Sequence, residues 1–237
     1  PENSRAAIRA ALWMGVDGVE VDVRHTQDEQ LVVIHDSTVE RTTHGSGVVS
    51  DMTASEVTAL TLLDENDMGE PYAGDYSCET VPTLLEIFEL TRDRVFIDLD
   101  TKTDRVDLVV QAIEEAAMLD QVFVSVSDVA RAQEARLLNP KVRIQVRPSD
   151  LSEWAEHEAL FPGRPPEIVE VPLPHLATFV DPIASIDAKL FSDAWEHDIQ
   201  VRLDVEPLDI YLQSFETGAN IIQSEFPGAV LSALERL

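Results

Sequence analysis

The stretch GVDGVEVDVRHTQDEQLVVIHD, residues 15–36, decides the fold class of this chain. It holds two Val-rich runs, and the run ending at Arg24 is separated by six residues from the run beginning at Leu31. Six residues are too few for a crossover helix, which takes a dozen or more. The two runs are therefore predicted to form an antiparallel hairpin that turns around Gln27, Asp28 and Glu29.

Outside this hairpin, Val- and Ile-rich runs alternate with segments of helical period, such as a predicted helix over Ile183–His197. This alternation is typical of a mostly parallel sheet with helices around it. The eight predicted strands are Val16–Val23, Leu31–Ile34, Val95–Leu99, Val122–Val126, Val142–Val146, Ile168–Val171, Ile199–Leu203 and Ala219–Ile222.

Eight strands in 237 residues favour a (β/α)8 TIM barrel, an α/β fold of about 250 residues in typical cases. A doubly wound sheet is the alternative. No linker or composition shift divides the chain, so we expect a single domain over residues 1–237 with a short insertion around residues 44–80.

Acidic side chains lie on one face of the first predicted strand. Residues two apart in a strand share a face, so Glu20 and Asp22 point together. If the loop is Asp28-Glu29, paired residue numbers sum to 57 and His35 lies opposite Asp22. If the loop is Gln27-Asp28, they sum to 55 and His35 lies opposite Glu20. Either register brings an imidazole beside the acid pair.

A later run, Val-Phe-Ile-Asp-Leu-Asp-Thr-Lys, places Asp98, Asp100 and Lys102 on one face of another predicted strand. Together with Glu20 and Asp22, Asp100 would complete an all-oxygen site suited to Mg²⁺ or Ca²⁺. Lys102 could hold an anionic group beside it. The alternative is a half-exposed sheet whose acids simply face water, with the His-Asp dipeptide as a strand-end turn.

Composition excludes several classes of protein. The chain carries 45 Asp and Glu against 17 Lys and Arg, a net charge of −28, which argues against binding nucleic acid or anionic membranes. The lone Cys78 rules out an intrachain disulfide and a Cys-built zinc site. With no membrane-length apolar run and no signal-peptide pattern, we expect no stable membrane insertion and favour a soluble cytoplasmic protein over a periplasmic or secreted one.

Six motifs follow one another in the first hundred or so residues. They are Pro1-Glu2-Asn3-Ser4, Gly15 to Val23, Val32-Val33-Ile34-His35-Asp36, Arg41-Thr42-Thr43 with Gly45 and Gly47, Pro82-Thr83-Leu84-Leu85-Glu86, and Asp100-Thr101-Lys102. In order and spacing, this set resembles the glycerophosphodiester phosphodiesterases, which belong to the PI-PLC-like phosphodiesterase superfamily.

The resemblance implies a TIM-barrel hydrolase that cleaves a small-molecule glycerophosphodiester to an alcohol and glycerol 3-phosphate. It implies a divalent metal, Mg²⁺ or Ca²⁺, held by Glu20, Asp22 and Asp100. His35 would act as a general acid or base, and Lys102 and Arg41 would contact the phosphate. Arg41 could equally be a loop residue that pairs with surface acids.

The family pattern also places a second catalytic histidine, in a His-Arg-Gly motif on the first strand of the barrel, before the position of Pro1. Two other functions stay open. One is a catalytically inactive barrel that binds metal or phosphodiester, and the other is a related phospholipase of the same barrel type. The sequence leaves the oligomeric state undetermined.

Overall fold

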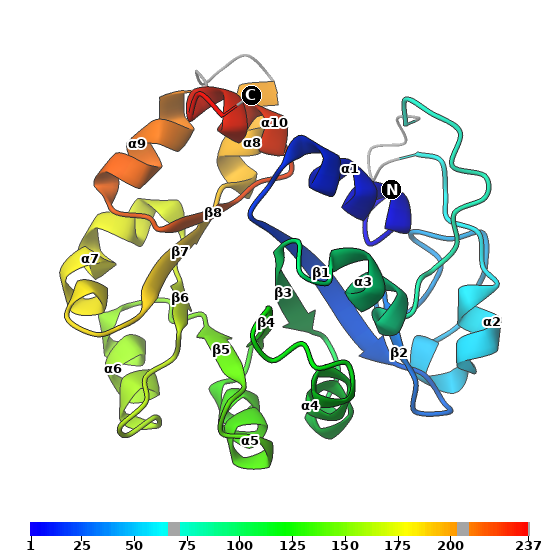
Figure 1. Cartoon of the computed structure of the whole chain (residues 1–237), viewed down its shortest axis with the longest axis horizontal. Helices are drawn as coiled ribbons and strands as arrows, with labels where there is room; N and C mark the ends of the chain where they lie inside the picture. The colour runs from blue at the N-terminus through cyan, green and yellow to red at the C-terminus, as the bar shows by residue number, and fades with distance from the viewer. Residues whose placement is uncertain (66–71, 203–208, 237) are drawn as a thin grey trace. The chain divides into compact units, whose positions relative to one another are not determined.

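The computed structural model describes residues 1–65, 72–202 and 209–236 (Figure 1). Its described part divides into two compact units, one made of residues 1–124 and 134–142 and the other of residues 125–133 and 143–237. The expectation of a single domain, with its insertion around residues 44–80, stays a prediction. None of the helices in the described ranges has the length and apolar character needed to cross a lipid bilayer.

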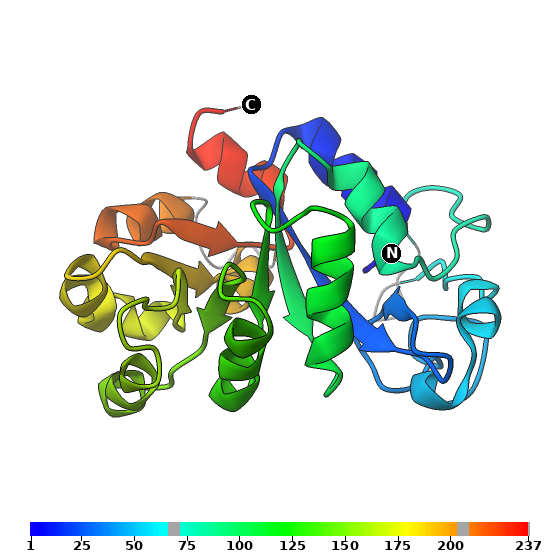
Figure 2. The ribbon, with the colours of Figure 1, turned by 60° about the horizontal axis from the view of Figure 1, so that its bottom comes forward.

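The first unit is built on four neighbouring strands in the order β2-β1-β3-β4. Its elements are α1 (Arg5–Met14), β1 (Gly18–His25), β2 (Leu31–Val33), η1 (Val49–Asp51), α2 (Ala54–Thr58), α3 (Leu84–Thr91), β3 (Phe96–Thr101), α4 (Val106–Glu115) and β4 (Val122–Ser125), and α5 (Val129–Leu138) has residues in both units. Strand β1 pairs antiparallel with β2 and parallel with β3. Helices α1 and α3 lie side by side, as Figures 1 and 2 show.

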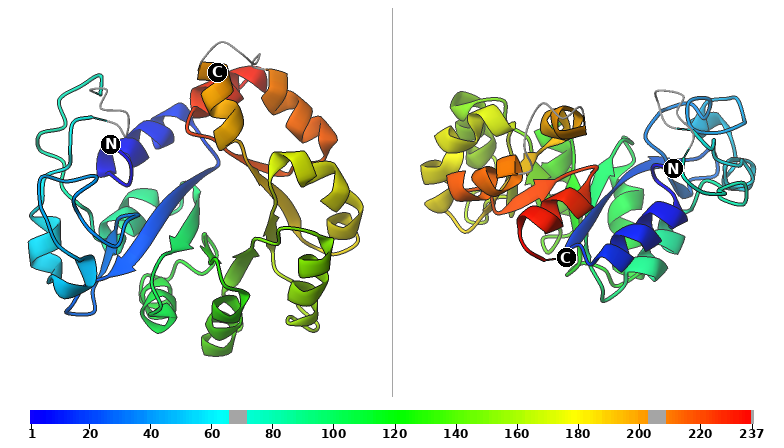
Figure 3. Two further views of the ribbon diagram at one scale, coloured as in Figure 1. Left: turned by 180° about the vertical axis from the view of Figure 1, so that it is seen from behind. Right: turned by 90° about the horizontal axis from the view of Figure 1, so that it is seen from above.

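The second unit continues the α/β alternation. It contains β5 (Arg143–Val146), α6 (Leu151–Ala159), β6 (Ile168–Glu170), η2 (Leu173–His175), α7 (Leu176–Ala184), β7 (Lys189–Asp193), α8 (Trp195–Arg202), α9 (Asp209–Thr217), β8 (Ile221–Gln223) and α10 (Pro227–Ala233). Strands β5, β6, β7 and β8 pair in that order, all parallel. Helices α7 and α9 are neighbours (Figure 3).

Side-chain alternation explains how the first unit forms its core. Val19, Val21 and Val23 of β1 are buried on one side of the strand, and the acids lie on the other. Helix α4 buries Val106, Val109, Val110 and Ile113, the spacing of one helical face. The acidic face of β1 is thus fixed by the apolar residues behind it.

The hairpin forms where it was predicted, but both predicted registers are wrong. Val23 pairs with Val33 and His25 with Leu31, so paired residue numbers sum to 56. The reason is a three-residue loop, closed by the bond from Thr26 N to Gln30 O (2.9 Å), in which Glu29 takes a left-handed φ of 59°. A bond from Ile34 N to Asp22 O (3.0 Å) continues the pairing beyond β2, and Ile34 rather than His35 lies opposite Asp22.

Seven of the eight predicted strands lie within two residues of the observed strands at each end, and the remaining one is wrong. The strand predicted over Ile199–Leu203 is helical up to Arg202, and Leu203 lies outside the described residues. The missing strand is β7, inside the predicted helix Ile183–His197. Its middle residues, Leu190 and Phe191, are buried between β6 and β8.

The long connection between β2 and α3 has a core of its own. Seven buried apolar residues form it: Val32, Ile34, Val39, Val49, Val57, Leu62 and Val81. Short antiparallel bridges, including Thr43 with Leu62 and Thr61 with Thr80, tie the connection together. The residues after β2 therefore have fixed neighbours, although residues 66–71 lie outside the described part.

Candidate active site

The acidic cluster comes from two adjacent strands of the first unit. The parallel register of β1 and β3 sets Glu20 beside Asp98 and Asp22 beside Asp100. Carboxylate oxygens of Glu20, Asp22 and Asp100 all lie within 4.8 Å of one another. Asp22 and Asp100 are buried and Glu20 is half-buried. The structure thus brings together the three residues that the sequence predicts as metal ligands.

Burial and mutual repulsion make this cluster unfavourable without a cation. Burial raises the pKa of Glu20 well above its usual value, and the charges of Asp22, Asp98 and Asp100 raise it further. Burial also raises the pKa of Asp22, against the opposing effects of Asn3, Lys102 and His35. Three clustered carboxylates, two of them buried, are the donor set that Mg²⁺ or Ca²⁺ prefers, so the residues present fit such an ion.

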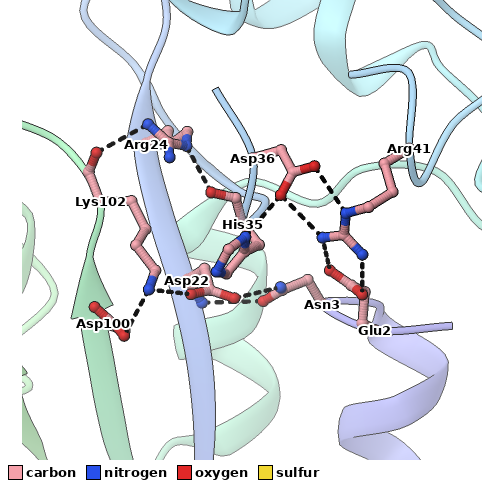
Figure 4. A network of polar contacts seen from close by, with 9 residues as sticks. All are labelled: Glu2, Asn3, Asp22, Arg24, His35, Asp36, Arg41, Asp100 and Lys102. Carbon is pink, nitrogen blue, oxygen red and sulfur yellow. Dashed lines mark hydrogen bonds and ion pairs between the residues drawn. The ribbon is translucent and has the colours of Figure 1, made fainter. Parts of the chain in front are cut away.

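Lys102 supplies positive charge next to the cluster. It follows the last residue of β3, and its Nζ lies 2.9 Å from Asp100 Oδ2 and 3.4 Å from Asp22 Oδ1 (Figure 4). Its backbone N donates to Val23 O at 3.1 Å, which holds the residue against β1. The ammonium group therefore lies where an anion bound at the acidic cluster would meet it.

His35 reaches the site from beyond the end of β2. Its Nδ1 lies 2.7 Å from Asp36 Oδ1, and Figure 4 shows the ring between Asp36 and Asp22. A carboxylate can only accept, so the neutral imidazole carries its proton on Nδ1 and keeps a lone pair on Nε2. Hydrogen bonds from Arg41 and His35 lower the pKa of Asp36 to about 2. Asp36 is therefore ionised at neutral pH and holds the ring in this tautomer.

Arg41 binds two carboxylates. Its Nε donates to Asp36 Oδ2 at 2.7 Å, and its two terminal nitrogens donate to Glu2 Oε2 and Oε1, each at 2.8 Å. One of these nitrogens also donates to Asp36 Oδ1 at 3.1 Å. These contacts match the alternative in which Arg41 pairs with acids. Its contact with a phosphate stays a prediction.

Three residues that sequence reasoning gave no role also belong to the site: Asn3, Arg24 and Asp36. Arg24 donates from Nε to His35 O (2.8 Å) and from a terminal nitrogen to Lys102 O (2.9 Å), so it ties the two flanking segments to β1. The two-residue period that groups Glu20 with Asp22 also includes Arg24 and could have indicated it. Asn3 stands in a quoted motif but carries no signal of its contact with Asp22.

Comparison with known proteins identifies relatives of this chain. Residues 1–150 match the model of the glycerophosphoryl diester phosphodiesterase family. A glycerophosphodiester phosphodiesterase of Caldanaerobacter subterraneus subsp. tengcongensis is 35% identical over 151 residues, 61% of this chain and 60% of the relative. Mouse glycerophosphodiester phosphodiesterase 1 is 39% identical over 103 residues, which make up 43% of this chain and 30% of the relative. The matched part is thus about three fifths or less of these relatives' length.

Solved structures show that the fold is shared. A glycerophosphoryl diester phosphodiesterase from Parabacteroides distasonis superposes with a TM-score of 0.82 at 23% identity, covering 99% of this chain and 81% of that one. An Oleispira antarctica phosphodiesterase in complex with the product sn-glycerol-3-phosphate gives a TM-score of 0.79 at 21% identity, covering 99% and 92%. Because the family match extends over more than half of its residues, this chain belongs to the glycerophosphoryl diester phosphodiesterase family.

Proposed function

We propose that the protein hydrolyses glycerophosphodiesters to an alcohol and glycerol 3-phosphate, in a reaction that depends on a divalent metal ion. The observation that carries the proposal is the cluster of Glu20, Asp22 and Asp100 with Lys102 beside it. Family membership supports the reaction class, and the product complex of the Oleispira antarctica relative supports glycerol 3-phosphate as a product.

The carboxylates of Glu20, Asp22 and Asp100 would hold Mg²⁺ or Ca²⁺. When bound, the ion supplies positive charge that stabilises the negative charge developing on the phosphate oxygens. Lys102 would bind a phosphate oxygen and neutralise part of its charge. Arg41, which is held by Glu2 and Asp36, is proposed as the more distant of the two basic contacts.

His35 would act as the base through Nε2. It would take the proton from the attacking water while the new P–O bond forms. If a glycerol hydroxyl attacks instead, a cyclic phosphate forms first, and water opens it to glycerol 3-phosphate in a second step. The existing bond from phosphorus to the alcohol oxygen then breaks, and a general acid protonates the departing alkoxide. The family pattern assigns that acid role to a second histidine, that of its His-Arg-Gly motif.

The test is release of glycerol 3-phosphate from glycerophosphocholine by the full-length protein with Mg²⁺ or Ca²⁺. We expect His35→Ala to lower kcat by about 10²- to 10⁴-fold, the range that acid–base groups contribute. Glu20→Ala, which removes a proposed metal ligand, should be inactive at a metal concentration that supports the wild type. His44→Ala is the matched control, since His44 is an exposed histidine outside this cluster. Undiminished activity in both site variants would refute the residue assignment, and metal binding without hydrolysis would favour an inactive barrel.

A further inference from the structure

The segment Pro1–Ser4, which the proposed reaction does not use, connects the two halves of the site. Asn3 takes a left-handed φ of 51°, a conformation that asparagine tolerates better than most residues. Ser4 fixes the segment to α1, since its Oγ accepts from Ala7 N (3.0 Å) and donates to Pro1 O (2.6 Å). The helix cap is thus complete without the side chains of Glu2 and Asn3, which are free to serve the site.

Asn3 holds the metal-binding half. Its Nδ2 donates to Asp22 Oδ2 at 2.8 Å, and its Oδ1 accepts from Asp22 N at 3.0 Å (Figure 4). Two bonds to one residue fix both the backbone and the carboxylate of Asp22. The other carboxylate oxygen, Oδ1, lies 3.4 Å from Lys102 Nζ. Asn3 therefore holds Oδ2 of Asp22 while Oδ1 faces Lys102.

Glu2 holds the histidine half. Both of its carboxylate oxygens accept from Arg41 at 2.8 Å, and Arg41 in turn holds both oxygens of Asp36. Asp36 accepts from His35 Nδ1. A chain of charged hydrogen bonds thus runs from Glu2 to the imidazole ring, and bidentate guanidinium contacts give it directional rigidity.

We propose that Glu2 and Asn3 are positioning residues that fix His35 relative to Asp22 across a single peptide unit. The bond from Ile34 N to Asp22 O (3.0 Å) already places the backbone before His35 beside β1. Adjacent Cα atoms are held about 3.8 Å apart by covalent geometry, so Glu2 and Asn3 would couple the orientation of the imidazole ring to that of the Asp22 carboxylate. Displacement of a reacting group by about 1 Å can cost on the order of 100-fold in rate, so this link has a catalytic consequence. The inference rests on the proposed function for its kinetic part only.

Substitutions of Asn3 and of Glu2 are expected to have different effects, the first on metal affinity and the second on His35. Asn3→Gly keeps the left-handed backbone without strain and removes the amide, without adding a charge that would itself attract a cation. It should weaken binding of Mg²⁺ or Ca²⁺ to the metal-free protein by about 10- to 100-fold, the usual effect of removing a hydrogen-bond partner of a metal ligand. Calorimetric titration with the metal alone measures this.

Glu2→Gln should leave metal affinity unchanged and lower kcat without raising KM, and excess metal should not rescue it. It should also reduce the population of the Nδ1-protonated tautomer of His35. Imidazole ¹⁵N resonances measure this population, and those of His35 are identified as the ones missing from the spectrum of His35→Gln. Insertion of one glycine between Glu2 and Asn3 keeps every side chain but breaks the spacing. It should reproduce the Glu2→Gln result while metal affinity is retained.

Glu29→Gln is the matched control, because Glu29 and Asp107 also share one guanidinium, that of Arg105, away from the acidic cluster. Thermal melts of all variants establish that they fold. If Asn3 and Glu2 variants match Glu29→Gln in metal affinity, tautomer and kcat, the inference is wrong. If the wild-type protein releases no glycerol 3-phosphate, the proposed function fails, while metal affinity and tautomer still decide the inference.

Discussion

Glu20 is a residue whose charge opposes folding in the absence of metal. Its pKa is raised above the usual value of 4.5 by burial and by the neighbouring aspartates. Between the unfolded and the folded pKa, the folded protein binds more protons than the unfolded chain, so the free energy of unfolding falls as pH rises through this window. Binding of a cation would offset this loss of stability.

Glu20→Gln is therefore expected to stabilise the metal-free protein while it weakens metal binding. The difference from wild type should be negligible near pH 4 and grow as pH rises, toward a gain on the order of 1 kcal/mol. Urea unfolding in EDTA across this pH range measures it. Glu56→Gln is the control of opposite sign, because hydrogen bonds from Thr53 lower the pKa of Glu56. A pH-independent difference for Glu20→Gln would contradict the prediction.

At the scale of elements, α3 links the hairpin to α1 through its N-terminus. Thr83 and Glu86 form a capping box, with Thr83 N donating to Glu86 Oε2 at 2.8 Å. Glu86 Oε1 also accepts from Arg5 of α1 at 3.1 Å, and Val33 N of β2 donates to Pro82 O at 2.9 Å. The start of α3 thus holds both the helix that follows Asn3 and the strand that leads to His35.

Thr83→Ala should cost about 1 kcal/mol of stability through loss of the cap. That corresponds to a fall in Tm of about 2–4 °C for a chain of this size. Thr53→Ala is the comparison, since Thr53 and Glu56 form the same box on α2, a five-residue helix whose first N–H, that of Ala54, donates to Asp28 of the hairpin loop at 2.8 Å rather than to α1. Calorimetry should show a larger loss for Thr83→Ala, and equal losses would mean that the link to α1 adds nothing.

The elements that local pattern predicts best are those whose burial follows a regular period. The alternation of valines in residues 18–25 and the apolar spacing of α4 identify both elements correctly. Helix α8 is an exception, because the alternation of Ile199 and Val201 with other residues predicts a strand where the chain is helical. Its Asp198 is fully buried and accepts from Tyr211 Oη (2.6 Å), Ser224 Oγ (2.7 Å) and Glu225 N (2.7 Å), contacts with distant residues that no local pattern shows.

For the molecule as a whole, the sequence predicts well which side chains come together in the site. It predicts poorly which other residues hold those side chains in place. Glu20, Asp22 and Asp100 follow from strand alternation and one parallel register, and the structure brings them together. His35 meets them although its predicted register was wrong, because β2 ends at Val33 and the chain turns. Asn3 lies 19 residues from Asp22 in sequence, and a contact over that distance depends on the folded structure.

The high negative charge of the chain makes it necessary to distinguish a specific metal site from diffuse attraction. A chain with 45 acidic residues attracts any divalent cation to some degree. A specific site should stabilise the folded protein, and so raise Tm, by an amount that grows with the logarithm of metal concentration above Kd and reaches about 2.7 kcal/mol at 100 Kd. Diffuse attraction should instead grow gradually with salt and be matched by NaCl of equal ionic strength. Calorimetric melts of the EDTA-treated protein with added Mg²⁺, Ca²⁺ or NaCl separate the two. Glu20→Gln should lose the stabilisation that only Mg²⁺ or Ca²⁺ gives and keep the part that NaCl also gives. An equal response of both proteins would place the metal outside this cluster.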